Sequence, residues 1–125
     1  MSIDAGTRET YQKIKGHDFF DKVITNLKKY SESEGDVSLK FIILEGINDN
    51  KEEIDGFIKI AKGIARYIII SNDSYQIRNM MSAKDFGMLK YFIQECKKQR
   101  LQFYLDMDRF NISDVHKIKS VCRVS

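Results

Sequence analysis

The stretch 37–62, VSLKFIILEGINDNKEEIDGFIKIAK, combines two kinds of secondary-structure signal in direct succession. Its first part, Val37–Leu44, has the length of a β-strand and is rich in β-branched and aromatic side chains. Asn50, followed three residues later by Glu53, is a helix start signal, and apolar residues then recur at helical spacing. The stretch therefore predicts one strand connected to one helix.

The same strand–helix unit recurs on both sides of this stretch. Further strands are predicted for Tyr67–Ser71 and Leu101–Asp106, and residues 2–4 resemble the end of another strand. Asp18 and Ser82 have the pattern of residues that precede a helix, and a short helix is predicted from about Ser113. Strands that alternate with helices pair in parallel through right-handed crossovers.

The number of units predicts the fold class. Four such units in 125 residues correspond to half of a (β/α) barrel, which takes about 250 residues. We therefore expect an α/β half-barrel with about four parallel strands in sequence order and helices on one face only. No Gly/Ser-rich linker divides the chain, so residues 1–125 are expected to form a single domain.

The composition of the chain limits which binding partners and which cellular location are expected. The net charge of +3 is small and the basic residues are scattered, so nucleic acid is not an expected partner. The sequence has no signal peptide and no apolar run near the roughly 18 residues of a membrane span, which predicts a cytoplasmic protein without a membrane partner. Cys96 and Cys122 stand far apart and alone, so they cannot form a four-cysteine zinc site or hold an iron–sulfur cluster.

Three consecutive segments together resemble the second half of radical S-adenosylmethionine (radical SAM) enzymes. These are SIDAGTRETYQKIKG (2–16), FFDKVITNLKKY (19–30) and the stretch 37–62. The superfamily often has a Ser-x-Asp sequence at the end of its fourth strand, then a helix that ends in a basic–Gly pair, then a Gly-x-Asn-Asp turn after the fifth strand. Ser2 with Asp4, Lys15-Gly16 and Gly46–Asp49 match these positions, and the resemblance covers roughly residues 1–106.

The resemblance implies a parent enzyme that reductively cleaves S-adenosylmethionine at a four-iron four-sulfur cluster and starts radical chemistry on a small-molecule or peptide substrate. The Cys-x-x-x-Cys-x-x-Cys loop of that superfamily is not in this sequence. The chain is then a fragment, a separately encoded half or a degenerate remnant, inactive alone and without cofactors of its own. Its expected partner is the missing N-terminal half-barrel or a second copy of itself. The alternative is a non-enzymatic α/β module that binds a nucleotide or a protein.

Candidate ligand-binding residues lie where the predicted strands end, because ligands of parallel barrels bind at the carboxyl ends of the strands. The resemblance implies that Ser2 and Asp4 contact the ribose hydroxyls or the methionyl end of the cofactor; alternatively, Asp4 satisfies backbone donors. Because side chains alternate along a strand, Lys40 is expected to point into the lumen of the barrel. A buried amine needs an anionic partner there, which is either an acid of a neighbouring strand or the carboxylate of a substrate or cofactor. By the resemblance, Ser71 and Asn72 lie near the adenine.

Two further segments carry predictions. In the polar connection Asn72–Met81, Tyr75 and Arg78 are candidates for substrate contact. The apolar stripe of Asn111–Ser125 is expected either to cover the open face of the half-barrel or to leave that face to a second copy of the chain.

Overall fold

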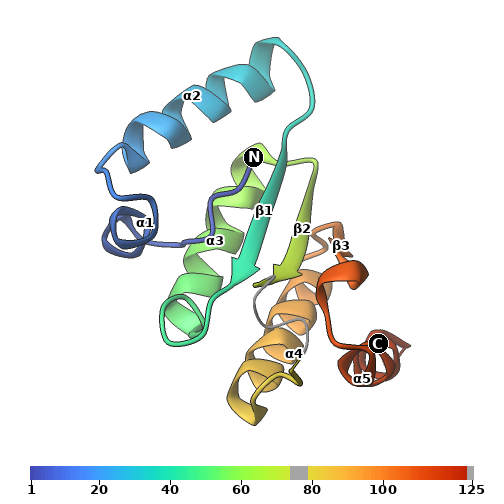
Figure 1. The fold of residues 1–125 in the computed structure, drawn as a ribbon. Coiled ribbons are helices and arrows are strands. Elements are labelled where there is room, and N and C mark those ends of the chain that lie inside the picture. The colour runs from blue at the N-terminus through green and yellow to red at the C-terminus, as the bar shows by residue number, and fades with distance from the viewer. Residues whose placement is uncertain (74–78, 124–125) are drawn as a thin grey trace.

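The computed structural model describes residues 1–73 and 79–123, and Figure 1 shows the alternation of helices and strands. The helices and strands are, in chain order, α1 (Arg8–Lys15), α2 (Phe20–Ser33), β1 (Ser38–Ile43), α3 (Lys51–Ile64), β2 (Tyr67–Asn72), α4 (Ala83–Lys98), β3 (Phe103–Leu105), the 3-10 turn η2 (Met107–Arg109) and α5 (Ile112–Arg123). None of the helices in the described ranges is long and apolar enough to cross a lipid bilayer.

The sheet is parallel and its strands follow sequence order, β1-β2-β3. Lys40 pairs with Ile69, and Ile69 pairs with Tyr104, so these three residues lie in one row across the sheet. The N-terminal segment adds an isolated parallel bridge from Ser2 to Lys40 on the outer side of β1. This confirms the α/β class and the sequential parallel order, with the first of the four expected strands reduced to a single bridge.

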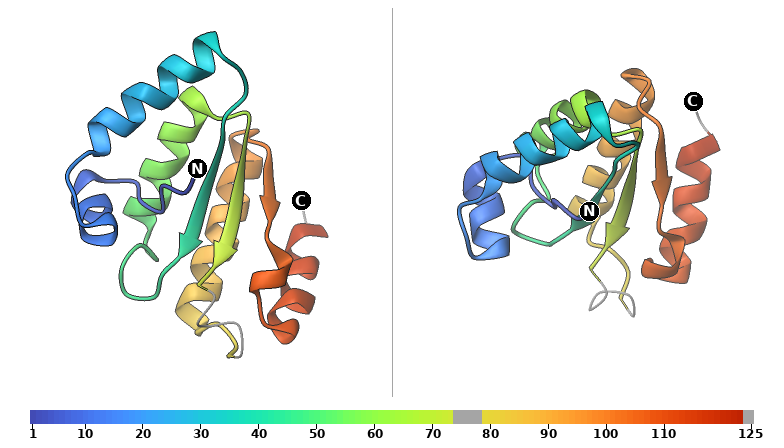
Figure 2. Two further views of the ribbon diagram at one scale, coloured as in Figure 1. Left: turned by 45° about the horizontal axis from the view of Figure 1, so that its top comes forward. Right: turned by 90° about the horizontal axis from the view of Figure 1, so that it is seen from above.

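One face of the sheet packs against helices α3 and α4, which lie on the same side of the strands (Figures 1 and 2). Side chains on that face alternate with those on the other face, as the pleat requires. Phe41 of β1 lies between Phe57 of α3 and Phe92 of α4, with ring centroids 5.1 and 5.2 Å away. All three rings are fully buried, so they form the centre of the core.

The other face of the sheet is open. Lys40, Tyr67, Ile69, Tyr104 and Asp106 line a hollow of about 520 Å³ on this face. Lys40 points to this side, as the alternation along its strand predicted. The open face and the sequential strand order are those of part of a (β/α) barrel.

Helix α5 packs on α4 and does not cover the open face, contrary to one of the two alternatives for Asn111–Ser125. The Asp114 carboxylate accepts a 2.8 Å hydrogen bond from the Met81 N–H, and Lys97 Nζ donates to the Cys122 carbonyl at 2.7 Å. Ile118 is fully buried. An apolar stripe predicts that a helix is packed but not which element receives it, and here the long helix α4 does.

The predicted helix starts are correct at two positions and wrong at one. Asn50 Oδ1 accepts from the Glu53 N–H at 3.0 Å, and Ser82 Oγ accepts from the Asp85 N–H at 3.1 Å. Helix α2, however, begins at Phe20, and the residue before it, Phe19, makes no side-chain capping bond. Asp18 therefore does not cap this helix.

Contacts with helix α3 hold the N-terminal segment in place next to the sheet. The buried Glu53 carboxylate accepts hydrogen bonds from the N–H groups of Gly6 and Thr7, at 3.0 and 3.2 Å, and from the Thr7 hydroxyl at 2.8 Å. Gly6 also packs backbone to backbone against Gly56 of α3. These contacts hold Ser2–Asp4 beside β1.

Candidate functional site

A hollow of about 230 Å³ lies at the carboxyl ends of β1 and β2. It is lined by Lys40, Ile42, Leu44, Ser71, Asn72, Asp73 and Arg109. Three of the five residues that the sequence singled out, Lys40, Ser71 and Asn72, thus lie together. Ser2 and Asp4 are not among the residues that line it.

Lys40 has a carboxylate partner within the chain. Its Nζ lies 3.4 Å from Asp106 Oδ2, just beyond the end of β3, and the same oxygen accepts from Ser71 Oγ at 3.3 Å. The structure therefore shows pairing with an acid of the chain, although that acid follows β3, which is separated from β1 by β2, and not a strand directly beside β1. The side chains of Lys40 and Asp106 are 32% and 28% exposed, so a ligand carboxylate can still reach this ammonium.

Arg109 is a lining residue that the sequence analysis did not identify. It belongs to η2, immediately after β3, and is exposed. Within residues 1–73 and 79–123, no carboxylate forms an ion pair with its guanidinium. A guanidinium that has no carboxylate partner in these ranges and lies at the rim of a hollow favours an anionic group of a ligand, which it can bind through two parallel hydrogen bonds. Its position just after a strand end was the signal available in the sequence.

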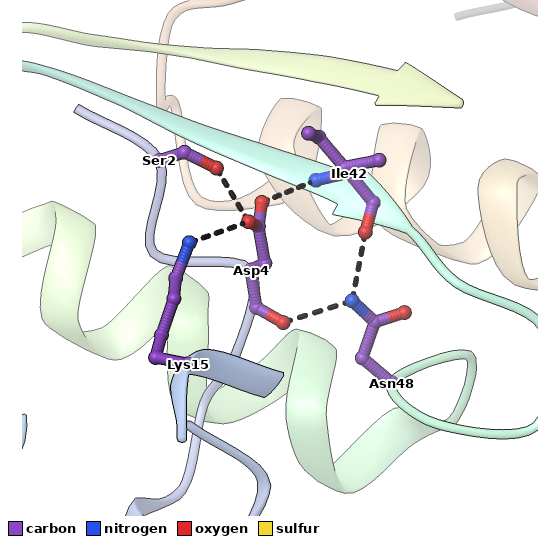
Figure 3. A network of polar contacts seen from close by, with 5 residues as sticks. All are labelled: Ser2, Asp4, Lys15, Ile42 and Asn48. Atoms are coloured by element: carbon purple, nitrogen blue, oxygen red, sulfur yellow. Dashed lines mark hydrogen bonds and ion pairs between the residues drawn. The ribbon is translucent and has the colours of Figure 1, made fainter. Parts of the chain in front are cut away.

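Asp4 lies in a polar network beside β1 (Figure 3). Its Oδ1 accepts a 2.7 Å hydrogen bond from the Ile42 N–H, while Oδ2 contacts the Ser2 hydroxyl and lies 3.1 Å from Lys15 Nζ. Asn48 Nδ2 donates to the carbonyls of Asp4 and Ile42, at 2.8 and 2.7 Å. Both carboxylate oxygens thus have partners inside the chain, which supports the capping interpretation of Asp4. The cofactor contacts of Ser2 and Asp4 stay a prediction.

The same network explains why the first strand is only a bridge. Asp4 has a φ of 60°, in the left-handed region, so the backbone leaves the extended conformation directly after Ile3. Its side chain then accepts from the Ile42 N–H, which a longer neighbouring strand would have bonded through its backbone. The carboxylate thus replaces one rung of the β-ladder.

Two buried acids lie near this edge of the sheet, on the side of the helices. Asp49, in the turn before α3, and Asp85, in the first turn of α4, are 2% and 7% exposed. Burial, together with a hydrogen bond to Asp49 and its charge, raises the pKa of Asp85 to about 7. Burial opposes ionisation of Asp49, yet hydrogen bonds from Asp85 and the Gly46 N–H and the charge of Lys84 lower its pKa. The two carboxyl groups therefore share a proton near neutral pH.

This pair predicts a pH-dependent stability. The pKa of Asp85 rises from 3.8 to about 7 on folding, so the folded state binds the extra proton and is stabilised at low pH. That stabilisation is lost as the pH rises from about 4 to 7, by up to roughly 1.4 kcal/mol per pH unit. The Asp85→Asn variant, which cannot ionise, should not show this loss. Urea unfolding of both proteins at pH 5, 6, 7 and 8 measures the difference.

The comparison with the variant isolates Asp85, because all other titrating groups are common to both proteins. The lowered pKa of Asp49 acts in the opposite direction, but only below its usual value of 3.8, outside the measured range. Parallel stability curves for the two proteins between pH 5 and 8 would show that the acids do not share a proton.

The cysteines do not fit an iron–sulfur cluster. Cys96 is fully buried in the core, and burial raises the pKa of its thiol to about 12, whereas a cluster is held by thiolates. Cys122 lies on α5 and is a free thiol. In the part of the chain that the structure describes, no three His, Cys, Asp or Glu side chains are arranged to hold a metal ion. The two candidates for substrate contact, Tyr75 and Arg78, lie outside the described residues.

Comparisons with known proteins identify a fold. No protein-family model matches the sequence, and no curated protein matches it. Among solved structures, the chain is similar to the crystal structure of a radical SAM methyltransferase from Sphaerobacter thermophilus, with a TM-score of 0.62 and 12% sequence identity. The match covers 83% of this chain and 32% of that chain, so this chain spans about a third of that protein's length. The chain therefore has a radical SAM-like fold, and identity this low shows the fold alone.

Proposed function

We propose that this chain is the C-terminal half of a radical SAM-type (β/α) barrel and acts together with an N-terminal half-barrel that carries the cluster. The observation that carries the proposal is the open face of a sequential parallel sheet in a chain that matches part of a radical SAM methyltransferase. A closed barrel has no free edges, whereas Ser2 and β3 here form the two outer edges of the sheet.

The open face supplies the surface that a second half-barrel needs. Tyr67 and Tyr104 pack edge to face on it, with ring centroids 5.2 Å apart, and Tyr104 is 51% exposed. Ile69 lies between Lys40 and Tyr104 in their row of paired residues. Aromatic and aliphatic side chains on an uncovered face favour burial against a partner, which is either the N-terminal half or a second copy.

The residues of the carboxyl-edge hollow would bind parts of S-adenosylmethionine and not the cluster. When bound to a reduced cluster, this cofactor supplies the radical in the enzymes that the sequence resembles. Lys40 and Arg109 carry the positive charge that a methionyl carboxylate requires, and Ser71 and Asn72 supply hydroxyl and amide groups near the end of β2. The substrate of such an assembly is a small molecule or a peptide.

A non-enzymatic α/β module that binds a nucleotide or a protein is the second candidate. The guanidinium of Arg109 lies at the strand ends and forms no ion pair with a carboxylate of the described residues, so it is compatible with a phosphate as well as a carboxylate. This candidate predicts that the chain binds its ligand alone, whereas the first requires the other half-barrel.

The isolated chain is expected to bind S-adenosylmethionine with a Kd well above the micromolar range. Lys40 is already paired with Asp106, and no set of metal ligands in the described ranges could hold the cluster to which the methionyl group binds in that superfamily. Isothermal titration calorimetry of the purified chain measures this. Low-micromolar affinity without added iron would favour an independent binding module.

The assembly is tested by co-expressing the chain with the polypeptide that carries the three-cysteine loop, encoded in the same gene or beside it. After anaerobic reconstitution with iron and sulfide, the two together should cleave S-adenosylmethionine under reducing conditions, and neither should do so alone. Arg109→Ala in this assembly should raise the KM for S-adenosylmethionine by about tenfold, the effect of one lost charge-assisted hydrogen bond. No cleavage by the assembled halves would overturn the proposal.

A further inference from the structure

The carboxylate of Asp106 engages two of the groups that the carboxyl-edge hollow, at the ends of β1 and β2, offers to a ligand. Asp106 Oδ2 lies 3.4 Å from Lys40 Nζ and accepts a hydrogen bond from Ser71 Oγ at 3.3 Å. Lys40 and Ser71 line this hollow, and Asp106 is not among the residues that line it. Asp106 lines the larger hollow of the open face, and Lys40 lines both. An acid of the chain therefore neutralises, from outside the hollow, the ammonium that a ligand anion would use.

The chain holds this carboxylate loosely. Its contacts with Lys40 and Ser71 both involve the same oxygen, and both are longer than the roughly 2.7–2.9 Å that is typical of a charge-assisted hydrogen bond. The side chains of Asp106 and Lys40 are 28% and 32% exposed, so water reaches the pair. Ion pairs that are open to solvent contribute little to stability. The Asp106 carboxylate can therefore leave Lys40 without a large loss of stability.

The pair of Asp4 and Lys15 shows what a firmly held carboxylate looks like in the same chain (Figure 3). The side chain of Asp4 is 5% exposed, and Lys15 Nζ lies 3.1 Å from its Oδ2. Its other oxygen, Oδ1, accepts a 2.7 Å hydrogen bond from the Ile42 N–H. Asp4 is thus fixed by short contacts to both oxygens, whereas Asp106 is in a position to exchange places with another anion.

The backbone at Asp106 is anchored, so only its side chain has to move. The Asp106 N–H donates to the Ile70 carbonyl at 2.9 Å, and the Asp106 carbonyl accepts from the Arg109 N–H at 2.9 Å. The side chain makes no capping hydrogen bond to η2. A rotation about the Cα–Cβ bond, toward the open-face hollow that Asp106 already lines, therefore frees Lys40 and Ser71 while Arg109 keeps its place at the carboxyl-edge hollow.

We propose that Asp106 competes with the carboxylate group of a ligand for Lys40 and Ser71, and so sets how strongly the carboxyl-edge hollow binds that group. The inference rests on the proposed function, which places a ligand carboxylate in this hollow. It adds that the Asp106 carboxylate is an internal substitute for the ligand carboxylate when no ligand is bound. The ligand takes over the contacts with Lys40 and Ser71 and gains the guanidinium of Arg109, which lines the same hollow.

The test is a nitrogen-15 NMR titration of the full chain with N-acetylmethionine and with its amide, two probes that differ only in the carboxylate. With the wild type, N-acetylmethionine should shift the backbone amide signals of Ser71 and Arg109 with a Kd on the order of 10 mM. Asp106→Asn removes the competing charge and keeps the size of the side chain. It should lower this Kd about tenfold, the effect of one charge-assisted hydrogen bond regained. The amide probe should bind both proteins equally weakly.

Asp108→Asn is the matched control. Asp108 is an exposed acid of the same turn, η2, and is not among the residues that line the hollow. Its replacement changes the net charge by the same amount and should leave both Kd values unchanged. Lys40→Met, added to Asp106→Asn, should cancel the gain, because it removes the ammonium for which Asp106 and the ligand compete. Urea unfolding checks that each variant is folded, and Asp106→Ala removes the same charge where Asp106→Asn fails to fold.

Three results would overturn the inference. The first is a Kd of Asp106→Asn for N-acetylmethionine that is unchanged or not measurable, and the second is a higher Kd, which would show that Asp106 positions Lys40 for the ligand. The third is an equal gain with the amide probe, which would show that charge plays no part. The proposed function fails separately: cleavage by the assembled barrel with an unchanged Kd here would overturn only this inference, whereas a tenfold gain here without cleavage there would overturn only the proposed function.

Discussion

Gly56→Ala is expected to destabilise the protein by at least about 3 kcal/mol, because the added methyl group has no space. A Cβ at position 56 would lie 2.3 Å from the carbonyl oxygen of Gly6, and a Cβ at position 6 would lie 2.1 Å from that of Glu53. The atoms on both sides belong to the backbone, so no side chain can rotate away. With a total stability of about 5–15 kcal/mol, such a loss leaves a marginal fold.

Gly63→Ala is the matched control, on the same helix α3. A Cβ at position 63 would meet nothing within 4 Å. The same substitution should there stabilise the protein by up to about 1 kcal/mol, because alanine favours the helix and restricts the unfolded chain. Urea unfolding of both variants and the wild type gives the three midpoints. Equal midpoints for the two variants would show that the Gly6–Gly56 contact does not exist in solution.

The elements that could be predicted from the sequence are those with a local signal. The caps at Asn50 and Ser82 depend on one side chain and an N–H group three residues away, and both form as expected. Asp18 has the same local pattern, but helix α2 begins only at Phe20, and the Phe19 N–H donates to His17 Nδ1 at 3.4 Å. A residue with the same sequence pattern therefore does not cap a helix when the backbone enters the helix at a later residue.

The residues of the candidate site could be predicted in part, where a local sequence pattern places them. Alternation along one strand placed Lys40 on the open face, and the ends of strands placed Ser71 and Asn72 at the carboxyl edge. The partners of these residues could not be predicted, because they depend on contacts between distant parts of the chain. Asp106 lies 66 residues from Lys40, and the Asp49–Asp85 pair joins the start of α3 to the start of α4.

Two hollows lie at the carboxyl edge of the sheet. The hollow with Lys40 and Arg109 lies beside the hollow of the open face, with which it shares Lys40. A smaller hollow of about 180 Å³ is lined by Glu45 and Asp85, together with Asn72, Met80, Met81 and Ser82. Asn72, at the end of β2, lines both, so it lies where the end of the sheet meets the start of α4.

Asp4→Ala is expected to cost about 3 kcal/mol of stability even in the isolated chain. The Ile42 N–H, which donates to Asp4 Oδ1 at 2.7 Å, would be left without an acceptor, at a cost of about 1–3 kcal/mol. Lys15, only 26% exposed, would lose its carboxylate partner at 3.1 Å. Alanine also tolerates the φ of 60° at this position less well than aspartate does.

Two further variants separate this structural role from a purely functional one. Asp4→Asn keeps an oxygen for the Ile42 N–H and a residue type that accepts positive φ, so it should lose about half as much stability. Asp36→Ala removes an exposed carboxylate whose ion pair with Arg66 is open to solvent, and its unfolding midpoint should stay close to that of the wild type. If Asp4→Ala also kept the wild-type midpoint, the network of Figure 3 would not stabilise the fold. In that case, a lowered rate of S-adenosylmethionine cleavage by the assembled barrel with this variant would assign the carboxylate to the cofactor. If the midpoint falls as expected while Asp4→Asn still supports cleavage, the carboxylate serves to end the first strand and to hold Ser2 beside β1.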